Sequence, residues 1–333
     1  MEFDVILGNA LRAALGPPAA IYAIAAIGLN IHFGYAGLLN FGQVGFVMLG
    51  AYGMSVSVAT FDLSMWIGIP IGLLLCVAFA LALGVPTLRL RADYFAITTI
   101  AAAEIIRRLI RSSHAVDLTG GPFDLSGVAG SFREDLNPIP AGRYGWGTFQ
   151  FSAEQVWTLI WAWTVVIVLS ALVYRLARSP WGRVLKSIRE DEDAARSLGK
   201  NAVGYKMQAL VLGGVIGGLA GVFDAIDQSG VSANNYQAQV TFFLYTALIL
   251  GGAATRVGPV VGAMLFWLIQ ETVRTTVDQL AEQSWLPDFL TNFLDGNGSA
   301  IAIIVIGGVL MALMVFRPQG LFGNVQEMQL DAR

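Results

Sequence analysis

The chain has 333 residues, of which 56% are hydrophobic and only 13% charged, with a formal net charge of −3; its mean hydropathy is +0.64. A soluble domain carries about a quarter charged residues, so this composition indicates a membrane protein, and the charge excludes a nucleic-acid binder. A single cysteine and two distant histidines, read as ordinary loop or helix-end residues, exclude a disulfide framework and a metal cluster.

Several uncharged runs of about 18 or more residues predict helices that cross a membrane. The predicted fold is all-α, a polytopic helical membrane protein with about nine transmembrane helices in a single domain, 1–333. A short amphipathic helix over 1–16 is expected to lie at the interface. The expected spans cover 18–33, 34–60, 66–86, 94–109, 154–176, 207–227, 240–250, 263–277 and 300–316.

Two glycine-rich segments interrupt the apolar pattern. GYAGLLNFGQVGFVMLGAY (34–52) is compatible with tight helix packing or with unwound backbone along a polar pathway, and both interpretations stay open. GGAATRVGPVVGA (251–263) predicts a broken helix or a helical hairpin within 240–277. The candidates for a solute path in these segments are Asn40, Gln43, Gly251, Gly252 and Gly258.

Charges within the fourth expected span allow two interpretations. Glu104 precedes Arg107 and Arg108 by three and four residues, which places opposite charges on one helical face. A charge inside a membrane suggests function, but near a helix end local pairing and snorkelling are sufficient. The polar connection that follows, 112–153, is long enough to predict an extracytoplasmic lid or docking surface.

The segment 178–206 is a charged island with seven basic and four acidic residues. Its basic excess predicts a cytoplasmic location. Alternation of the spans then places 112–153, 278–299 and the N-terminus outside, whereas Arg107, Arg108 and Arg111 fall on the disfavoured side. The chain is expected to be a multi-pass protein of the cell membrane.

Apolar residues recur at helical spacing through this island and predict a helix over 183–198 on the cytoplasmic face, ended by Gly199. The apolar stripe comprises Trp181, Leu185, Ile188, Ala195 and Leu198. The small residues of DAARSLG (193–199) suit the groove of another protein. A solvated loop would show the same basic excess, so both interpretations remain.

The island resembles the cytoplasmic coupling loop of ABC-transporter permeases, in which an Ala-Ala pair is followed closely by Gly. Four further segments resemble permeases of branched-chain amino acid importers: 34–52, 94–125, 251–263 and FRPQGLFG (316–323). The resemblance covers about residues 20–323 in the order of the family. One departure is PFDL after Thr119-Gly120-Gly121, where the family has a small polar residue and Asp-Gly.

The resemblance implies a second, similar permease subunit, two ATP-binding cassette subunits and an extracytoplasmic solute-binding protein. The solute would be a branched-chain or other neutral amino acid; the alternative is urea or a short amide. The coupling residues that it implies are Arg189, Glu190, Asp193, Ala194, Ala195, Arg196 and Gly199.

The sequence predicts no enzymatic activity. A Walker motif needs Gly-Lys followed by Ser or Thr, but Gly199-Lys200 is followed by Asn201, so any ATP would be bound by partner subunits and no cofactor by this chain. HExxH and GxSxG are absent from the sequence. The remaining rival is an ion-coupled carrier, whose proton or sodium relay would have to use Glu104, Asp224 or Glu271.

Overall fold

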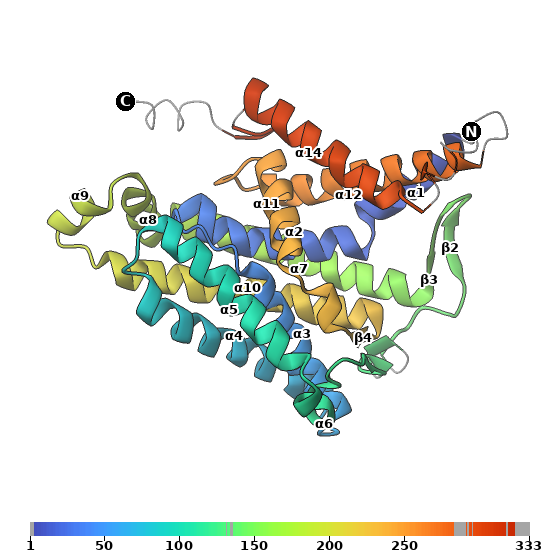
Figure 1. Ribbon diagram of the computed structural model, residues 1–333, viewed down its shortest axis with the longest axis horizontal. Helices are drawn as coiled ribbons and strands as arrows, with labels where there is room; N and C mark the ends of the chain where they lie inside the picture. Colours follow the sequence, from blue (N-terminus) through green and yellow to red (C-terminus); the bar gives the residue numbers. More distant parts are fainter. Residues whose placement is uncertain are drawn as a thin grey trace.

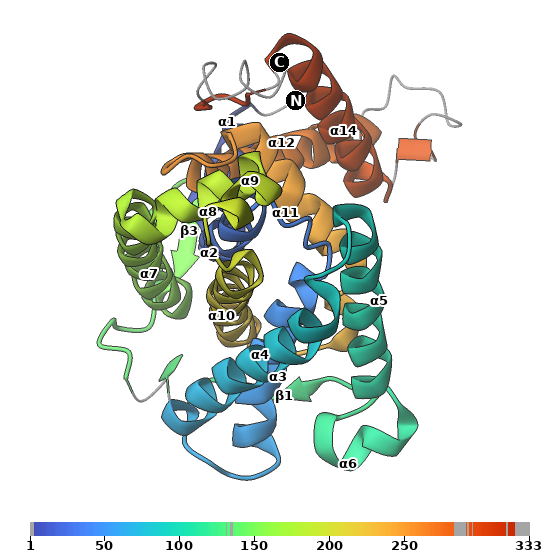
Figure 2. The ribbon, with the colours of Figure 1, turned by 90° about the vertical axis from the view of Figure 1, so that its left-hand side faces the viewer.

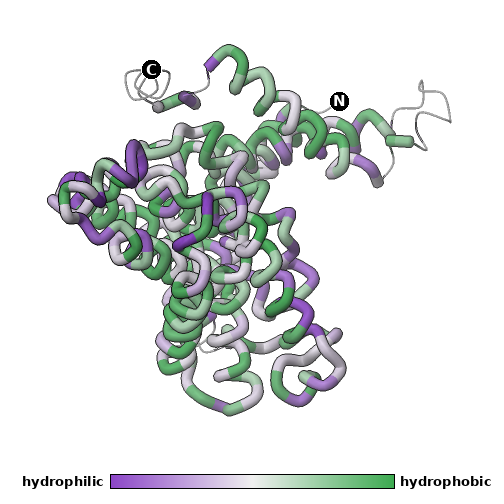
Figure 3. Tube along the Cα trace, turned by 60° about the vertical axis from the view of Figure 1, so that its left-hand side comes forward, coloured by the Kyte–Doolittle hydropathy of each residue, from purple (hydrophilic) through white to green (hydrophobic). Residues whose placement is uncertain are grey.

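The computed structural model describes residues 3–130, 132–133, 136–282, 291, 293–294, 296–317 and 319–323. The described chain is a bundle of helices with two short two-stranded sheets (Figure 1). Hydrophobic stretches run along the helices, and hydrophilic residues collect at their ends and in the connections (Figure 3). The predicted helical class is confirmed. Within the segment 278–299, residues 283–290, 292 and 295 lie outside the described residues.

Five described helical stretches are long and apolar enough to cross a membrane. They are Phe3–Tyr35, which joins α1 (Phe3–Leu15), α2 (Pro17–Asn30) and the π-helix η1 (Ile31–Tyr35), and the helices α4 (Met65–Thr87), α7 (Ala153–Arg178), α10 (Ala202–Gln228) and α14 (Gly298–Phe316). Two apolar helices are shorter, α3 (Gln43–Ala59) and α11 (Ala238–Gly251). The expected number of about nine spans is therefore not confirmed.

Helix α10 lies in the middle of the bundle and packs against α2, α3 and α4 (Figure 2). Glycines allow this packing, because their backbones touch those of the neighbouring helices. A Cβ added to Gly221 would lie 1.8 Å from the carbonyl oxygen of Val47, and one added to Gly50 would lie 2.0 Å from that of Gly218. These contacts support the tight-packing interpretation of the glycines at 34–52.

A helical hairpin occupies the region where the sequence predicted a break. Helices α11 and α12 (Gly258–Ala281) pack on each other, and α1 and α14 both contact α12. The turn of the hairpin is tight, because a Cβ on Gly251 would lie 1.8 Å from the carbonyl oxygen of Gly258. Gly252 has a φ of +110°, which a residue with a side chain rarely adopts.

The connection 112–153 departs from the all-α expectation. It contains η2 (Ser113–Ala115), α6 (Val116–Thr119) and the strands β1 (Leu125–Ser126), β2 (Arg143–Trp146) and β3 (Phe149–Ser152). β2 and β3 form an antiparallel hairpin whose turn contains Gly147 at φ +56°. β1 pairs with β4 (Gly230–Val231), which precedes η4 (Ala233–Asn235). The connection is therefore joined to the segment between α10 and α11.

The charges of α5 (Ala92–Ile110) are paired locally. The Glu104 carboxylate accepts hydrogen bonds from Arg107 and Arg108 at 2.8 and 2.9 Å. Arg108 remains exposed to 78%. This geometry agrees with local pairing near a helix end.

Candidate coupling site

The charged island folds into two helices, α8 (Pro180–Glu190) and α9 (Glu192–Ser197), where one helix over 183–198 was expected. Asp191 between them has extended backbone angles, φ −153° and ψ 104°. Its carboxylate accepts a hydrogen bond from the backbone N–H of Ala194 at 2.9 Å. Asp191 therefore caps a new helix instead of continuing the first, which is the usual role of Asp at a helix start.

The end of α9 agrees with the sequence prediction. Gly199 has a φ of +76°, and its N–H donates to the carbonyl oxygen of Arg196 at 2.9 Å. The N–H of Lys200 donates to the carbonyl oxygen of Ala195 at 3.2 Å. These two bonds form a Schellman motif, so Gly199 ends the helix as predicted.

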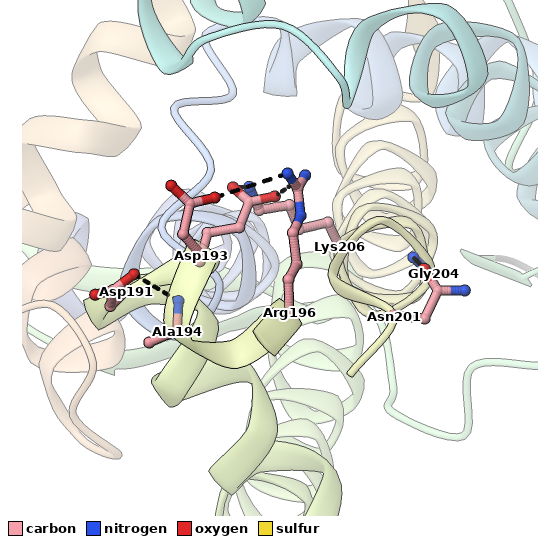
Figure 4. A network of polar contacts seen from close by, with 8 residues as sticks. Asp191, Asp193, Ala194, Arg196, Asn201, Gly204 and Lys206 are labelled. Carbon is pink, nitrogen blue, oxygen red and sulfur yellow. Dashed lines mark hydrogen bonds and ion pairs between the residues drawn. The ribbon is translucent and has the colours of Figure 1, made fainter. Parts of the chain in front are cut away.

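Glu192 links α9 to the beginning of α10 through ion pairs with Arg196 and Lys206, which Figure 4 labels. Its carboxylate pairs with Arg196, one helical turn away, at 2.6 Å and with Lys206 in the first turns of α10. Asn201 caps α10 by accepting a hydrogen bond from the N–H of Gly204 at 3.0 Å. The two short helices and the end of α10 are thus held as one unit.

Glu192→Gln is expected to loosen this unit and to lower ATP-driven uptake several-fold, because both of its ion pairs lose a charge. The matched control is Lys200→Gln, since Lys200 is exposed, is not one of the expected coupling residues and has no ion pair among the described residues. Uptake by cells that contain equal amounts of each variant measures the effect. Equal loss in both variants would contradict a role for the Glu192 pairs.

Of the two alanines in DAARSLG (193–199), one is buried and the other is exposed. Ala195 is only 3% exposed and packs in a small cluster with Ile188 and Ala202. Ala194 is exposed, and Leu198 is exposed to 80% although it is apolar. Asp193, Ala194 and Leu198 are therefore among the exposed residues of this segment that are available to another protein, and α9 lies at the extreme end of the molecule in Figure 1. Ala195 supports this surface from within.

Arg189 joins α8 to the loop that follows the π-helix η1. Its guanidinium donates a hydrogen bond to the carbonyl oxygen of Gly34. Its side chain also lies against Gly37, where an added Cβ would be 2.8 Å from the Arg189 Cγ and where φ is +67°. Among the expected coupling residues, Arg189 thus contacts η1 and the loop after it, as Ala195 contacts the start of α10.

Inside the bundle, a buried polar network ties this loop to α10. His32, predicted to be an ordinary loop or helix-end residue, is fully buried at the centre of the network. Its Nε2 lies 3.1 Å from the carbonyl oxygen of Leu210 and must donate to it, so Nδ1 is free to accept from the Asn40 amide at 3.0 Å. Asn40 also donates to Gln43 at 3.2 Å. Gln43 in turn donates to the carbonyl oxygen of Gly213 at 3.3 Å.

Asn40 and Gln43 therefore hold helices together in this conformation and are both fully buried. Gly251 and Gly258 face each other across the hairpin turn, and an added Cβ on Gly252 would lie 2.8 Å from the backbone of Gly323. The five residues predicted for a solute path all make internal contacts here. Their contact with solute stays a prediction.

The region around the glycine break at 251–258 contacts both the end of α2 and the segment 319–323. The Asn30 side chain donates to the carbonyl oxygen of Thr255 at 3.1 Å and accepts from the N–H of Ala254 at 2.8 Å. The N–H groups of Leu321 and Phe322 donate to the last carbonyls of α11 at 3.1 Å. Segments distant in sequence thus converge at the end of the bundle where Arg189 attaches.

This arrangement, a bundle of apolar helices joined to a projecting polar unit, defines the membrane subunit of a transporter. Residues 18–316 match the family described as the branched-chain amino acid transport system permease component. The chain belongs to this family and is a multi-pass membrane protein.

Individual relatives agree with this assignment. The high-affinity branched-chain amino acid transport system permease protein LivM of Escherichia coli is 31% identical over 310 residues, which cover 90% of this chain and 67% of that protein. The probable LivM of Methanocaldococcus jannaschii is 26% identical, covering 75% and 77% of the two chains. The nucleoside ABC transporter permease protein NupC of Lactococcus lactis is 26% identical, covering 70% and 72%.

Proposed function

We propose that the chain, as a permease of an ABC importer, carries branched-chain or other neutral amino acids together with a second permease subunit. Two ATP-binding cassette subunits would drive it, and an extracytoplasmic binding protein would deliver the solute. The names of the LivM relatives support this solute class. The family assignment supports the subunit partners.

The observation that carries the coupling proposal is the link from Arg189 to the carbonyl oxygen of Gly34. In the proposed mechanism, an ATPase subunit binds the exposed surface that includes Asp193, Ala194 and Leu198. Closure of the ATPase pair then moves α8 and α9 as one body, because the ion pair between Glu192 and Lys206 and the packing of Ile188 and Ala195 against Ala202 hold them to α10. Arg189 transmits this displacement to η1, and the membrane helices switch between two arrangements.

Arg189→Gln is expected to uncouple the importer. Uptake of a radiolabelled amino acid by the reconstituted complex should fall at least ten-fold, while ATP hydrolysis continues, because α8 can move without pulling on Gly34. Arg183→Gln is the matched control on the same helix, since Arg183 is exposed and donates a hydrogen bond to the carbonyl oxygen of Arg178, close to it in sequence. Parallel loss of uptake and hydrolysis in Arg189→Gln would contradict uncoupling.

Uptake into vesicles that contain the reconstituted complex also distinguishes an ABC importer from an ion-coupled carrier. Two of the three relay candidates, Glu104 and Glu271, are paired with arginines on their own helices at 2.8 and 2.7 Å. Uptake should therefore require ATP and should not follow an imposed proton or sodium gradient. Uptake driven by a gradient without ATP would overturn the proposal.

A further inference from the structure

A cavity of about 290 Å³ lies at the far end of α10 from the coupling site. The 27 residues of α10 place the two about 40 Å apart, at a rise of 1.5 Å per residue. Helices α2, α3, α10, α11 and α12 contribute its walls. Its size is at the lower limit of small-molecule sites, so it suits a ligand of few atoms.

Most of the wall is apolar or aromatic. Ile21, Val47, Val240 and Leu244 line it with aliphatic side chains. The rings of Tyr22 and Trp267 stand edge to face at 5.2 Å and form one side. Such a wall suits an aliphatic group, and electron-rich ring faces also attract cations.

Two carboxylates, those of Asp224 and Asp227, line the same cavity, and none of the described lining residues is basic. Asp224 is held in place by hydrogen bonds from the hydroxyl of Tyr236 at 2.6 Å and the amide of Gln228 at 2.7 Å. Asn235 donates to the Gln228 carbonyl at 3.0 Å. Burial and the Asp224 carboxylate raise the pKa of Tyr236, so its hydroxyl stays protonated as a donor.

The position of these carboxylates on α10 is electrostatically unfavourable without a cation. They lie in the last turns of a helix, where the negative end of the helix dipole repels them, and three residues apart they repel each other. The guanidinium of Arg133 pairs with Glu154 and with the hydroxyl of Ser229; it also attracts the Asp227 carboxylate, but it does not line the cavity. The cavity thus holds two carboxyl groups, of which that of Asp224 is fixed by hydrogen bonds, beside an apolar wall.

We infer that this cavity binds the ammonium group of an aliphatic solute, with Asp224 and Asp227 as its counter-ions and the apolar wall against its hydrocarbon chain. This inference rests on the proposed function and narrows it: an amino acid has the required ammonium group, whereas urea and simple amides do not.

The test uses the purified complex and pairs of small probes. Isoamylamine has the ammonium and carbon chain of leucine without its carboxylate, and 4-methylpentanoate has the carboxylate without the ammonium. Leucine and isoamylamine should raise the midpoint of thermal unfolding, because a ligand that binds only the folded state stabilises it. 4-Methylpentanoate and urea should leave the midpoint unchanged.

Asp227→Asn should raise the half-effective concentration of isoamylamine at least ten-fold, and Asp227→Glu should retain most of the binding. Asp117→Asn, at an exposed carboxylate outside the cavity, is the control. Val240→Phe, which fills the cavity without changing its charge, should also weaken the binding of isoamylamine. This variant provides the test if Asp227→Asn does not fold. Equal stabilisation by 4-methylpentanoate or urea, or an unchanged response in both Asp227→Asn and Val240→Phe, would overturn the inference.

ATP-driven leucine uptake by the wild-type complex is measured in parallel. Amine binding without uptake would count against the proposed function alone. Uptake with an unchanged amine response in the variants would count against the cavity alone.

Discussion

Leu198→Asp is expected to abolish ATP-driven uptake and to release the ATPase subunits from the purified complex. Leu198 is exposed to 80%, so its side chain contributes nothing to packing within the chain that a charge would disturb. An apolar side chain buried at the centre of an interface commonly contributes about 2 kcal/mol or more, which is roughly 30-fold in affinity. Co-purification of tagged ATPase subunits and uptake measured in the same cells give the result.

The controls for this variant separate docking from folding. Leu198→Met keeps an apolar side chain of similar volume and should retain uptake. Ala195→Asp should instead lower the stability of the permease itself, because it places a charge in the cluster with Ile188 and Ala202. Normal ATPase retention in Leu198→Asp would show that α9 is not a docking surface.

Gly221→Val should have the largest effect on the stability of the permease. The added Cβ would lie 1.8 Å from the carbonyl oxygen of Val47, so α3 and α10 would have to separate. Overpacking of this kind typically costs 1–3 kcal/mol, and a backbone clash lies at or above the upper end. The midpoint of thermal unfolding in detergent and the yield of monodisperse protein measure the loss.

Gly307→Val in α14 is the matched control. An added Cβ at Gly307 meets no described atom within 4 Å, so the same substitution should leave the midpoint nearly unchanged. A similar loss in both variants would mean that glycine itself, and not the contact between α3 and α10, determines stability.

Much of the fold could be predicted from the sequence because hydrophobic runs and glycine breaks are local signals. The helical class and the helix end at Gly199 were predicted correctly, and of the two alternatives for the break at 251–263, a broken helix or a hairpin, the structure has the hairpin. The break at Asp191 was missed, because a run of acidic residues is compatible with both the interior and the start of a helix. The β-strands of 112–153 were missed as well, since β1 depends on a partner about 100 residues away in the sequence.

The candidate site was less predictable, since it depends on tertiary contacts. Ala194 and Ala195 are equivalent in sequence, yet the packing of Ile188 and Ala202 buries only one of them. His32 has no motif that reveals its network with Asn40 and α10. The pairing of Arg189 with Gly34 joins residues 155 positions apart, which no local pattern encodes.

The glycine contacts of α10 also determine how the helix can move. Where backbone meets backbone, as between Gly221 and Val47, no interlocking side chains must change rotamer before one helix slides along another. Small sliding displacements of packed helices are a known form of conformational change. A lengthwise shift of α10 would therefore meet no side-chain barrier at Gly221, but it would have to break the hydrogen bonds that His32 and Gln43 make to the carbonyl oxygens of Leu210 and Gly213.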